Sequence, residues 1–293
     1  MIIVKLIGGL GNQMFQYAAG RAIALKNNTS LKLDCSSFEQ YTLRSYRLDR
    51  FNIVEDFATH DEINHLKQDQ SQLFSFCFFK LQQKIIPWHK QSAIIERTCN
   101  FDPDFLKITG NAYLDGYWQS EKYFADIAHV IRNDFTFKEE PDELNKIVLL
   151  NILNSNSVSL HIRRGDYVSN PKTTEIHGVL ESEYYMESLN LMEKKVKEPE
   201  VFVFSDDMVW AKENLKTDLP LHFIDHNGVE KDYEDLRLMS NCKHHIIANS
   251  SFSWWGAWLG KKEGQVVVAP ARWFNTMSCN YNDRLPSGWL IIH

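Results

Sequence analysis

The sequence predicts an α/β protein with two domains, each built on a parallel β-sheet. The chain opens with an apolar strand, a glycine-rich turn, a helical stretch and a second strand, and beyond residue 140 five short apolar strands alternate with helical stretches. A charged patch that contains a proline separates the two regions. Strands that alternate with helices pair in parallel, because each helix carries the chain back along the sheet before the next strand begins.

The first domain is expected to span residues 1–140. Its opening reads IIVKLI, GGLGNQ, MFQYAAGRAIALKNN and SLKLD, which indicates strand, turn, helix and strand in that order. Residues 56–137 are expected to be mostly helical and irregular. The patch KEEPDE at 138–143 is the best candidate for a linker, because it combines a proline with charges and lacks apolar residues.

The second domain is expected to span residues 141–293. Its strands lie in VSLHI, VFVFSDD, LHFID, HHIIANSS and VVVAP, and ESEYYMESLNLMEKKVK and YEDLRLMSNC are expected to be helices. Polar residues follow these strands directly, and the carboxyl ends of parallel strands form the edge at which open α/β sheets bind ligands. We therefore expect a ligand site at this edge. The polar residues at the strand ends are Arg163, Arg164, Asp206, Asp207, Asp225, Asn249, Ser250 and Ser251.

Composition restricts the class of function. The 293 residues are 44% hydrophobic, which is enough for substantial cores. The net charge of −6 is spread over 32 basic and 38 acidic residues without long blocks of one sign, so we expect no binding of nucleic acid. The five cysteines are scattered and form no C-x-x-C pair. This pattern argues against a disulfide scaffold and a zinc site and favours reduced thiols.

The sequence also predicts a cytoplasmic location. The N-terminus enters the glycine-rich turn at once and lacks the pattern of a signal peptide. The aromatic-rich run LFSFCFFKLQQKIIPW at 73–88 contains lysines and is too short to span a bilayer. A helix buried in the core and a helix on the inner face of the membrane both fit this run, so a peripheral membrane contact stays open.

The turn GGLGNQ at 8–13 places three glycines between a strand and a helix, where the backbone can adopt positive φ and approach a ligand closely. Gly9, Gly11 and Asp34 partly match a dinucleotide fingerprint, which makes a nicotinamide-dependent oxidoreductase an alternative function. Met14 stands where the third glycine of that fingerprint would be. A tight structural turn would explain the glycines alone. The candidate ligand contacts in this turn are Gly9, Gly11, Asn12 and Gln13.

Arg163 and Arg164 offer planar, permanently charged donors that suit phosphate oxygens. Each such hydrogen bond contributes about 1.5–3 kcal/mol when water is excluded, so the pair could neutralise a diphosphate leaving group without a metal. Asp166 is expected to pair with one of the arginines. The tripeptide formed by residues 164–166 is also an adhesion sequence, which leaves a non-enzymatic adhesion or glycan-binding module as a second alternative.

The segment FSDD at 204–207 has adjacent carboxylates, whereas metal-dependent sugar transferases usually space theirs by one residue. We therefore expect no metal at this position. Ser205 or Asp206 is expected to cap the following helix, and a ligand contact by Asp206 and Asp207 remains open.

The segment ANSSFSWWGAWLG at 248–260 places hydroxyl groups where a strand ends and a helix is expected to begin. Backbone and side-chain donors at a helix N-terminus bind anions. Trp254, Trp255 and Trp258 recur at helical spacing, and we expect them to form a packed core face rather than to stack on a sugar.

The motifs GGLGNQMFQYA, HIRRGD, DLRLMSNC and ANSSFSWWGAWL, in this order, resemble the α-1,2-fucosyltransferases of glycosyltransferase family 11 from residue 2 to about residue 274. The resemblance implies a GT-B-like fold with two Rossmann-like domains and a cleft between them. It implies GDP-β-L-fucose as donor, no metal or other cofactor, and inverting transfer to O-2 of a terminal galactose. The acceptor would be an oligosaccharide or a lipid-linked glycan, as in the biosynthesis of lipopolysaccharide O-antigen.

The resemblance also implies roles for single residues. Arg163 occupies the position that holds the donor β-phosphate, and Ser251 matches a serine that contacts phosphate. His161 and Asp235 match positions that contact the guanine end of the donor in α-1,6 relatives. Asn12 matches an asparagine that touches the reaction centre in protein O-fucosyltransferases.

The expected mechanism is a single in-line displacement. Arg163 and the region 250–251 would stabilise the charge that grows on GDP while a base removes the proton from the galactose 2-hydroxyl. Acceptor choice is expected to reside in the first 140 residues. The candidate catalytic residues are Arg163, Asn12 and Asp166, and the candidates for the base are Asp166, Asp115, Glu181, Glu183 and His177.

Overall fold

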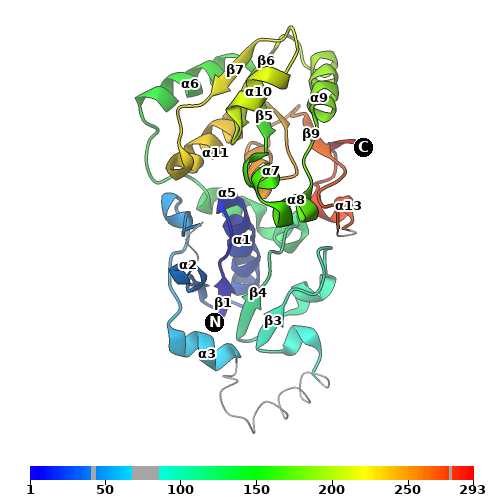
Figure 1. Ribbon diagram of the computed structural model, residues 1–293. Coiled ribbons are helices and arrows are strands. Elements are labelled where there is room, and N and C mark those ends of the chain that lie inside the picture. Colours follow the sequence, from blue (N-terminus) through cyan, green and yellow to red (C-terminus); the bar gives the residue numbers. More distant parts are fainter. Residues whose placement is uncertain (41–43, 68–85, 277–278) are drawn as a thin grey trace. The chain divides into compact units, whose positions relative to one another are not determined.

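A computed structural model describes residues 1–40, 44–67, 86–276 and 279–293. The chain divides into two compact units, Met1–Lys138 and Glu139–His293, and each has its own parallel sheet (Figure 1). Most of the aromatic-rich run at 73–88 lies outside the described residues. In the described part of the chain, no helix is both long and apolar enough to cross a membrane.

Unit 1 is built on a four-stranded sheet with strand order β2-β1-β4-β3, in which every pairing is parallel. Strand β1 reads IIVK, and its three apolar side chains are fully buried because both faces of a parallel sheet are covered. The strands are β1 (Ile2–Lys5), β2 (Leu31–Asp34), β3 (Ala93–Ile95) and β4 (Ala112–Asp115). The helices are α1 (Leu10–Lys26), α2 (Ser37–Gln40), α3 (His60–Lys67) and α5 (Ala128–Asp134).

Helix α1 begins earlier than predicted, inside the glycine-rich segment. Residues 11–13 form part of its first turn, and Gly9 is its N-cap residue. Gly8 has a φ of 77°, and a Cβ atom at this position would lie 2.7 Å from the side-chain nitrogen of Asn12. Glycine is therefore required where β1 turns into α1.

The prediction that residues 56–137 are mostly helical and irregular missed two strands. Strand β4 reads AYLD and pairs with the central strand β1, and β3 reads AII and pairs with β4. Within the described residues, these short runs are not flanked by the long helical stretches that mark the predicted strands, so the sequence does not distinguish them from irregular segments.

Unit 2 contains six parallel strands in the order β10-β9-β8-β5-β6-β7. The chain enters at the central strand β5, adds β6 and β7 on one side, and then returns to add β8, β9 and β10 on the other. This is the strand order of doubly wound nucleotide-binding sheets. The strands are β5 (Asn156–Ile162), β6 (Pro199–Ser205), β7 (Leu221–Ile224), β8 (His244–Ile246), β9 (Val267–Pro270) and β10 (Leu290–Ile292).

The five strands predicted for this region are confirmed, and β10 was not predicted. Helix α6 begins inside the patch predicted as a linker, where the carboxylate of Asp142 accepts a hydrogen bond from the backbone N–H of Asn145. The helices are α6 (Glu143–Asn154), α7 (Gly165–Ser169), α8 (Pro171–His177), α9 (Ser182–Lys195), α10 (Met208–Asn214), α11 (Asp232–Asn241), α12 (Ser251–Leu259) and α13 (Tyr281–Arg284).

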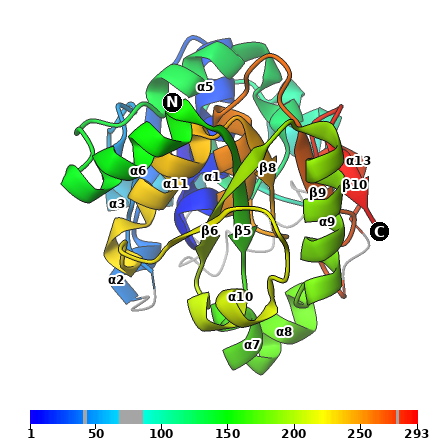
Figure 2. The same cartoon turned by 90° about the horizontal axis from the view of Figure 1, so that it is seen from above.

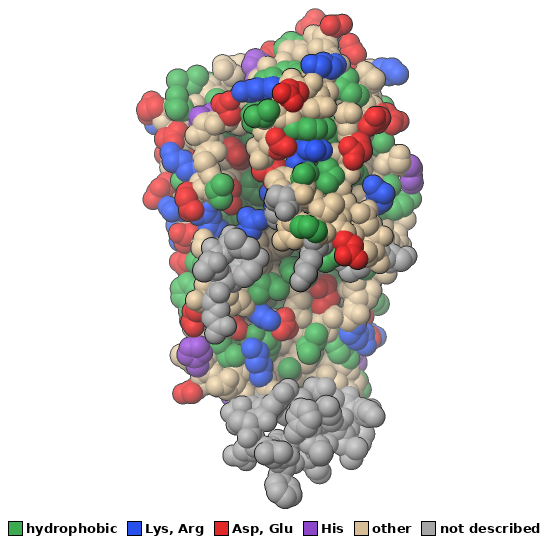
Figure 3. Space-filling view, in the orientation of Figure 1, with side chains coloured by type: hydrophobic (Ala, Val, Ile, Leu, Met, Phe, Trp, Pro, Cys, Tyr) green, Lys and Arg blue, Asp and Glu red, His purple; other side chains and the backbone are tan. Residues whose placement is uncertain are grey.

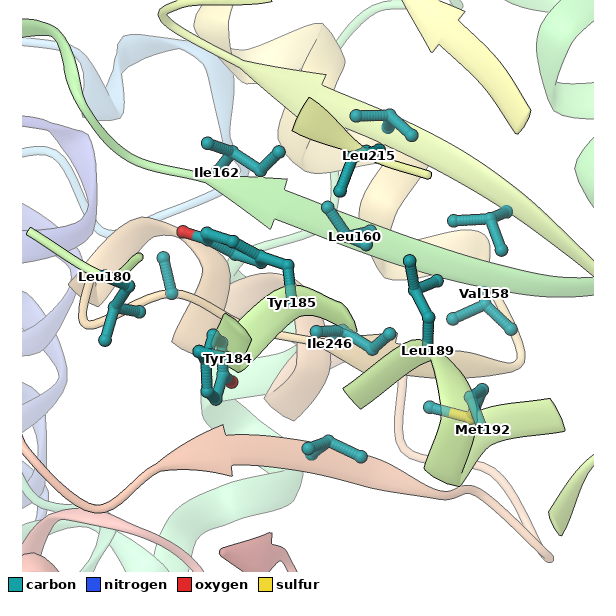
Figure 4. Close-up of a cluster of buried hydrophobic side chains, with 14 of the residues drawn as sticks. Val158, Leu160, Ile162, Leu180, Tyr184, Tyr185, Leu189, Met192, Leu215 and Ile246 are labelled. Atoms are coloured by element: carbon teal, nitrogen blue, oxygen red, sulfur yellow. The ribbon is translucent and has the colours of Figure 1, made fainter. Parts of the chain in front are cut away.

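Helices cover both faces of the second sheet, with α9 on one side and α6 and α11 on the other (Figure 2). Toward α9, the side chains of Val158, Leu160 and Ile162 pack with Tyr185 and Leu189 (Figure 4), and all five are fully buried. Burial of such side chains stabilises the unit by roughly 1.5–3 kcal/mol each.

The tryptophans of α12 are buried, as predicted. Trp254 and Trp255 have 0% exposed surface and Trp258 has 4%. The indole nitrogen of Trp254 donates to the carbonyl of Arg284 at 2.9 Å, which ties α12 to α13. These rings form core and are not available to stack on a sugar.

Two predictions from composition have different outcomes. Basic and acidic side chains are interspersed on the face seen in Figure 3, in line with the absence of single-sign blocks in the sequence.

The expectation of reduced thiols is only partly correct: Cys35 and Cys242 are free, whereas Cys99 and Cys279 are disulfide-bonded. Sequence spacing alone does not reveal such a bond, because its geometry depends on distances set by the fold.

Candidate donor-phosphate site

The strand order of unit 2 reverses between β5 and β8. In an open parallel sheet the crevice at this switch point, beyond the carboxyl ends of the strands, is where ligands bind. Arg163 and Arg164 directly follow β5, and Asn249 and Ser250 lie between β8 and α12, which begins at Ser251. The topology thus gathers the predicted cationic and hydroxyl groups at one edge of the sheet.

The two arginines are matched by the two aspartates at the end of the next strand. Ile162 pairs with Ser205 in the register of β5 and β6, so the residues that follow them run in parallel. Asp206 Oδ2 lies 2.6 Å from Arg163 Nη1, and Asp207 Oδ2 lies 3.5 Å from Arg164 Nε. Each guanidinium therefore has a carboxylate partner from the adjacent strand.

The structure corrects the predicted capping of α10. Asp207 is the N-cap residue, and its carboxylate accepts a hydrogen bond from Trp210 N at 3.1 Å. Ser205 Oγ accepts from the backbone of Asp207, and Asp206 is left to face the arginines. Asp206 and Asp207 were considered as donor contacts, and in this geometry both pair with the arginines that would hold the donor.

Gly165, which begins α7, leaves space for Asp206. A Cβ atom on Gly165 would lie 2.7 Å from Asp206 Oδ2, closer than real side chains allow. The backbone N–H of Arg164 donates to Asp206 Oδ1 at 2.7 Å. The side chain of Asp166, a predicted partner of the arginines and a candidate base, lies outside the described part of the structure.

Within the described residues, several buried polar atoms at this edge have no hydrogen-bond partner. They are Nδ1 of His161, Nε and Nη1 of Arg164, and Oδ1 of Asn249. Burial of an unsatisfied polar group costs about 1–3 kcal/mol, so these atoms are suited to meet a polar ligand. Burial lowers the pKa of His161 to about 4, with the nearby Arg163 acting in the same direction and Asp206 opposing it, so the imidazole is neutral at pH 7.

The start of α12 completes the edge. The hydroxyl of Ser250 accepts a hydrogen bond from Phe252 N at 3.3 Å, which caps the helix, and Ser251 is the first helical residue. Asn249 is fixed by donation from its side-chain nitrogen to the carbonyls of His177 and Trp273. The helix dipole favours an anion at this end of α12.

Asp235, predicted to contact the guanine, lies in the first turn of α11. Asn227 Nδ2 donates to Asp235 Oδ1 at 2.9 Å, and Asn227 is in turn held by the fully buried Asn145. The pKa of Asp235 is raised to about 7, chiefly by burial; the hydrogen bond from Asn227 opposes the rise, and the charges of Asp232 and Glu234 add to it. This amide network was missed in the sequence, which carries no pattern that links Asn145 to Asn227.

In unit 1 the strand order reverses between β1 and β4, and the GGLGNQ segment follows β1 at that point. Asn12 Oδ1 accepts a hydrogen bond from Gln119 at 2.8 Å, in the loop that follows β4. Gln13 is fully buried: its amide nitrogen donates to the carbonyls of Gly8 and Ser45, and its oxygen accepts from Arg47 N. These three bonds give Gln13 a structural role in the first turn of α1.

The other candidates for the base are placed as follows. Asp115 pairs with Lys5 at 3.0 Å at the end of β4. The ring of His177 stacks on that of Tyr167 with 4.9 Å between the centroids. Glu181 and Glu183 are both exposed. Among the described residues, no group of three or more His, Cys, Asp or Glu side chains could hold a metal ion.

Asp34, on which the nicotinamide alternative depends, is 1% exposed. Its carboxylate accepts hydrogen bonds from Tyr113 Oη at 2.6 Å and from Ser36 N at 2.9 Å. A ribose could reach it only if these contacts were broken.

Two Rossmann-like units, one with paired arginines and a helix N-terminus at its switch point, have the architecture of GT-B-like glycosyltransferases. Solved structures with this fold include a mutant of Arabidopsis thaliana FUT1 in complex with GDP, at a TM-score of 0.53 and 12% identity over 91% of this chain and 69% of that one. The fucosyltransferase NodZ from Bradyrhizobium matches at a TM-score of 0.51 and 14% identity, over 87% and 91% of the two chains.

The model of glycosyl transferase family 11 matches residues 1–293, and the chain belongs to this family. An alpha-1,2-colitosyltransferase of Escherichia coli is 36% identical over 100% of this chain and 99% of its own length. The O-antigen biosynthesis glycosyltransferase WbnK of Escherichia coli is 37% identical over 92% of this chain and 93% of its own length. Neither the oxidoreductase nor the adhesion module finds support in these relatives.

Proposed function

We propose that this glycosyltransferase moves L-fucose from GDP-β-L-fucose to the 2-hydroxyl of a terminal galactose, with inversion and without a metal. The observation that carries the proposal is the cluster of Arg163, Arg164 and the α12 N-terminus at the switch point of unit 2. A mouse relative, galactoside alpha-(1,2)-fucosyltransferase 2, is 26% identical over 87% of this chain and supports the linkage. The name of WbnK supports an O-antigen precursor as acceptor.

In the proposed reaction the bond between fucose C1 and the GDP oxygen breaks as the galactose oxygen bonds to C1, and the hydroxyl proton passes to a base. Arg163 and the N–H groups at the start of α12 stabilise the negative charge that grows on the leaving diphosphate. Arg164, His161 and Asn249 supply buried polar atoms along the donor, and Asp235 binds the guanine. Unit 1 is proposed to bind the acceptor, and Asn12 is its candidate for contact with the reacting galactose hydroxyl.

One relative is a colitosyltransferase, so a nucleotide-activated colitose is a second donor that should be tested. Transfer of a colitosyl group would use the same contacts to the diphosphate, since these contacts do not involve the sugar. The two functions therefore differ only in which nucleotide sugar is turned over.

The test is incubation of purified protein with GDP-fucose and either lactose or a Galβ1-3GalNAc glycoside in EDTA, followed by measurement of GDP release and of the new linkage. An α-1,2-linked fucose product establishes donor, linkage and metal independence together. GDP binding without transfer to either acceptor would direct the search to other acceptors and to the colitosyl donor. Absence of GDP binding in calorimetry would refute the proposal.

A further inference from the structure

One carboxylate, that of Asp206, contacts both the side chain and the backbone of the HIRRGD segment. Its Oδ2 lies 2.6 Å from Nη1 of Arg163, and its Oδ1 accepts a hydrogen bond of 2.7 Å from the backbone N–H of Arg164. Its Oδ2 also lies over Gly165, at the distance where a Cβ atom would not fit. Residues 163–165, which form the turn after β5, are thus arranged around the single side chain of Asp206.

This arrangement differs from an ordinary surface ion pair. The side chains of Arg163 and Asp206 are only 21% and 27% exposed, and Asp206 is carried by the end of β6, which is paired to β5 along its whole length. A flexible arginine side chain loses much rotational freedom when it is fixed, and a carboxylate on a rigid strand supplies that restraint. A guanidinium has five N–H donors in a fixed plane, so it can contact a carboxylate and a phosphate at the same time.

Asp207 cannot replace Asp206 in this task. Its carboxylate caps α10 through Trp210 N, and its separation from Arg164 is 3.5 Å. The guanidinium of Arg164 lies 4.1 Å from the ring of Trp210, which offers it a second hold. Arg163 pairs with Asp206 at 2.6 Å, and its guanidinium lies 5.4 Å from the ring of Tyr167.

We propose that Asp206 is the positioning residue of the reaction: it holds the Arg163 guanidinium and the Arg164 backbone in the geometry that receives the leaving diphosphate. The inference rests on the proposed function, because it assumes that Arg163 meets the donor phosphate. The contrary role would be that of a competitor, in which the carboxylate occupies the guanidinium and must be displaced by the donor. The two roles predict opposite effects of removing the negative charge.

The test compares Asp206→Asn and Asp206→Ala with wild type. Asp206→Asn keeps an oxygen for the Arg164 N–H but loses the charge that orients Arg163, whereas Asp206→Ala loses both contacts. We expect kcat to fall about 10- to 100-fold in Asp206→Asn and further in Asp206→Ala, since small misplacements of a catalytic group have effects of this size. We expect GDP affinity to fall by about 10-fold or less. A merely structural role would lower the melting temperature without this separation of kcat from binding.

Asp104→Asn is the matched control, because Asp104 Oδ2 also pairs with an arginine, Arg97, at 3.2 Å but in unit 1. Its kcat and GDP affinity should stay within about twofold of wild type, as for an exposed ion pair. Gly165→Ala is a second route to the same result, since the added Cβ displaces the Asp206 carboxylate without deleting it. It should reduce kcat even where substitution of Asp206 prevents folding.

Tighter GDP binding by Asp206→Asn would overturn the inference in favour of a competitor. Unchanged kcat in Asp206→Asn, or in Gly165→Ala, would overturn it as well. Wild-type protein that neither binds GDP nor releases it from GDP-fucose would instead refute the proposed function. Failure of the two ideas is therefore distinguishable in one set of measurements.

Discussion

Removal of the Arg163 side chain should impair the enzyme in two separable ways. Arg163→Ala deletes a charge-assisted contact to the diphosphate, which contributes about 1.5–3 kcal/mol. It also leaves the Asp206 carboxylate, now without its partner at 2.6 Å, facing an anionic donor. Two unit charges about 6 Å apart repel by roughly 1–3 kcal/mol at effective dielectric constants between those of water and the protein surface, and the partial exposure of Asp206 favours the lower end.

The sum is about 3–4 kcal/mol, which corresponds to a fall in kcat/KM of roughly 10²- to 10³-fold. The assay is GDP release from GDP-fucose with a saturating galactoside, with circular dichroism as a control for folding. The double variant Arg163→Ala/Asp206→Asn removes the repulsion but keeps an oxygen for the Arg164 N–H, and it should recover about fivefold relative to Arg163→Ala, whereas independent effects would multiply. Near wild-type turnover of Arg163→Ala would refute the role of this arginine, and a double variant worse than the single one would refute the repulsion.

Three further predictions concern stability and the guanine end. The stability of Asp235→Asn relative to wild type should increase as pH rises from about 4 to about 7 and then level off. The wild-type carboxyl, whose pKa is raised in the folded state, must lose its proton over this range, and this loss destabilises the folded wild type but not the amide. Chemical denaturation across this range measures the difference, and a difference that does not vary with pH would contradict the prediction. The same variant should bind GDP more weakly in calorimetry. Leu160→Ala should lower the free energy of unfolding by about 2–5 kcal/mol, since Leu160 is fully buried in the sheet, and a loss below 1 kcal/mol would show that the core repacks. Tyr184→Phe should cost about 1–2 kcal/mol in the same assay, because the Ile247 carbonyl loses a donor at 2.6 Å, and it should leave GDP affinity unchanged.

The fold of unit 2 could be predicted because its strands are short, apolar and followed by polar residues. VSLHI and VFVFS are each recognisable in isolation, and their helices have the expected amphipathic spacing. The strands β3, β4 and β10 could not be predicted. They are similar in length to β7, β8 and β9, but in the described part of the chain no long helical stretch adjoins them to mark the alternation of strand and helix, and they acquire strand structure by pairing with a neighbour.

The sequence could predict which polar residues lie at the carboxyl edge of the second sheet. The internal pairing of the site could not be predicted, because the match of Arg163 to Asp206 depends on the register of β5 against β6, which no local pattern encodes. The cap of α10 illustrates the same limit: Ser205, Asp206 and Asp207 are all competent cap residues, and the backbone geometry at the end of β6 selects the third. Gln13 follows the glycines as a ligand contact would, yet three buried bonds to the backbone fix it.

The central position of β5 has a consequence for the order in which the protein folds. Ser159 on β5 meets His245 on β8 across 86 residues of sequence, and Lys5 in unit 1 meets Asp115 across 110. Contacts this distant along the chain close slowly, because loop entropy is lost before the pairing compensates for it. The crevice between β5 and β8 therefore forms only after α11 and β8 have left the ribosome. Until then the turn at Arg163 and Arg164 exists without the N-terminus of α12, so the proposed donor site is completed late in the synthesis of the chain.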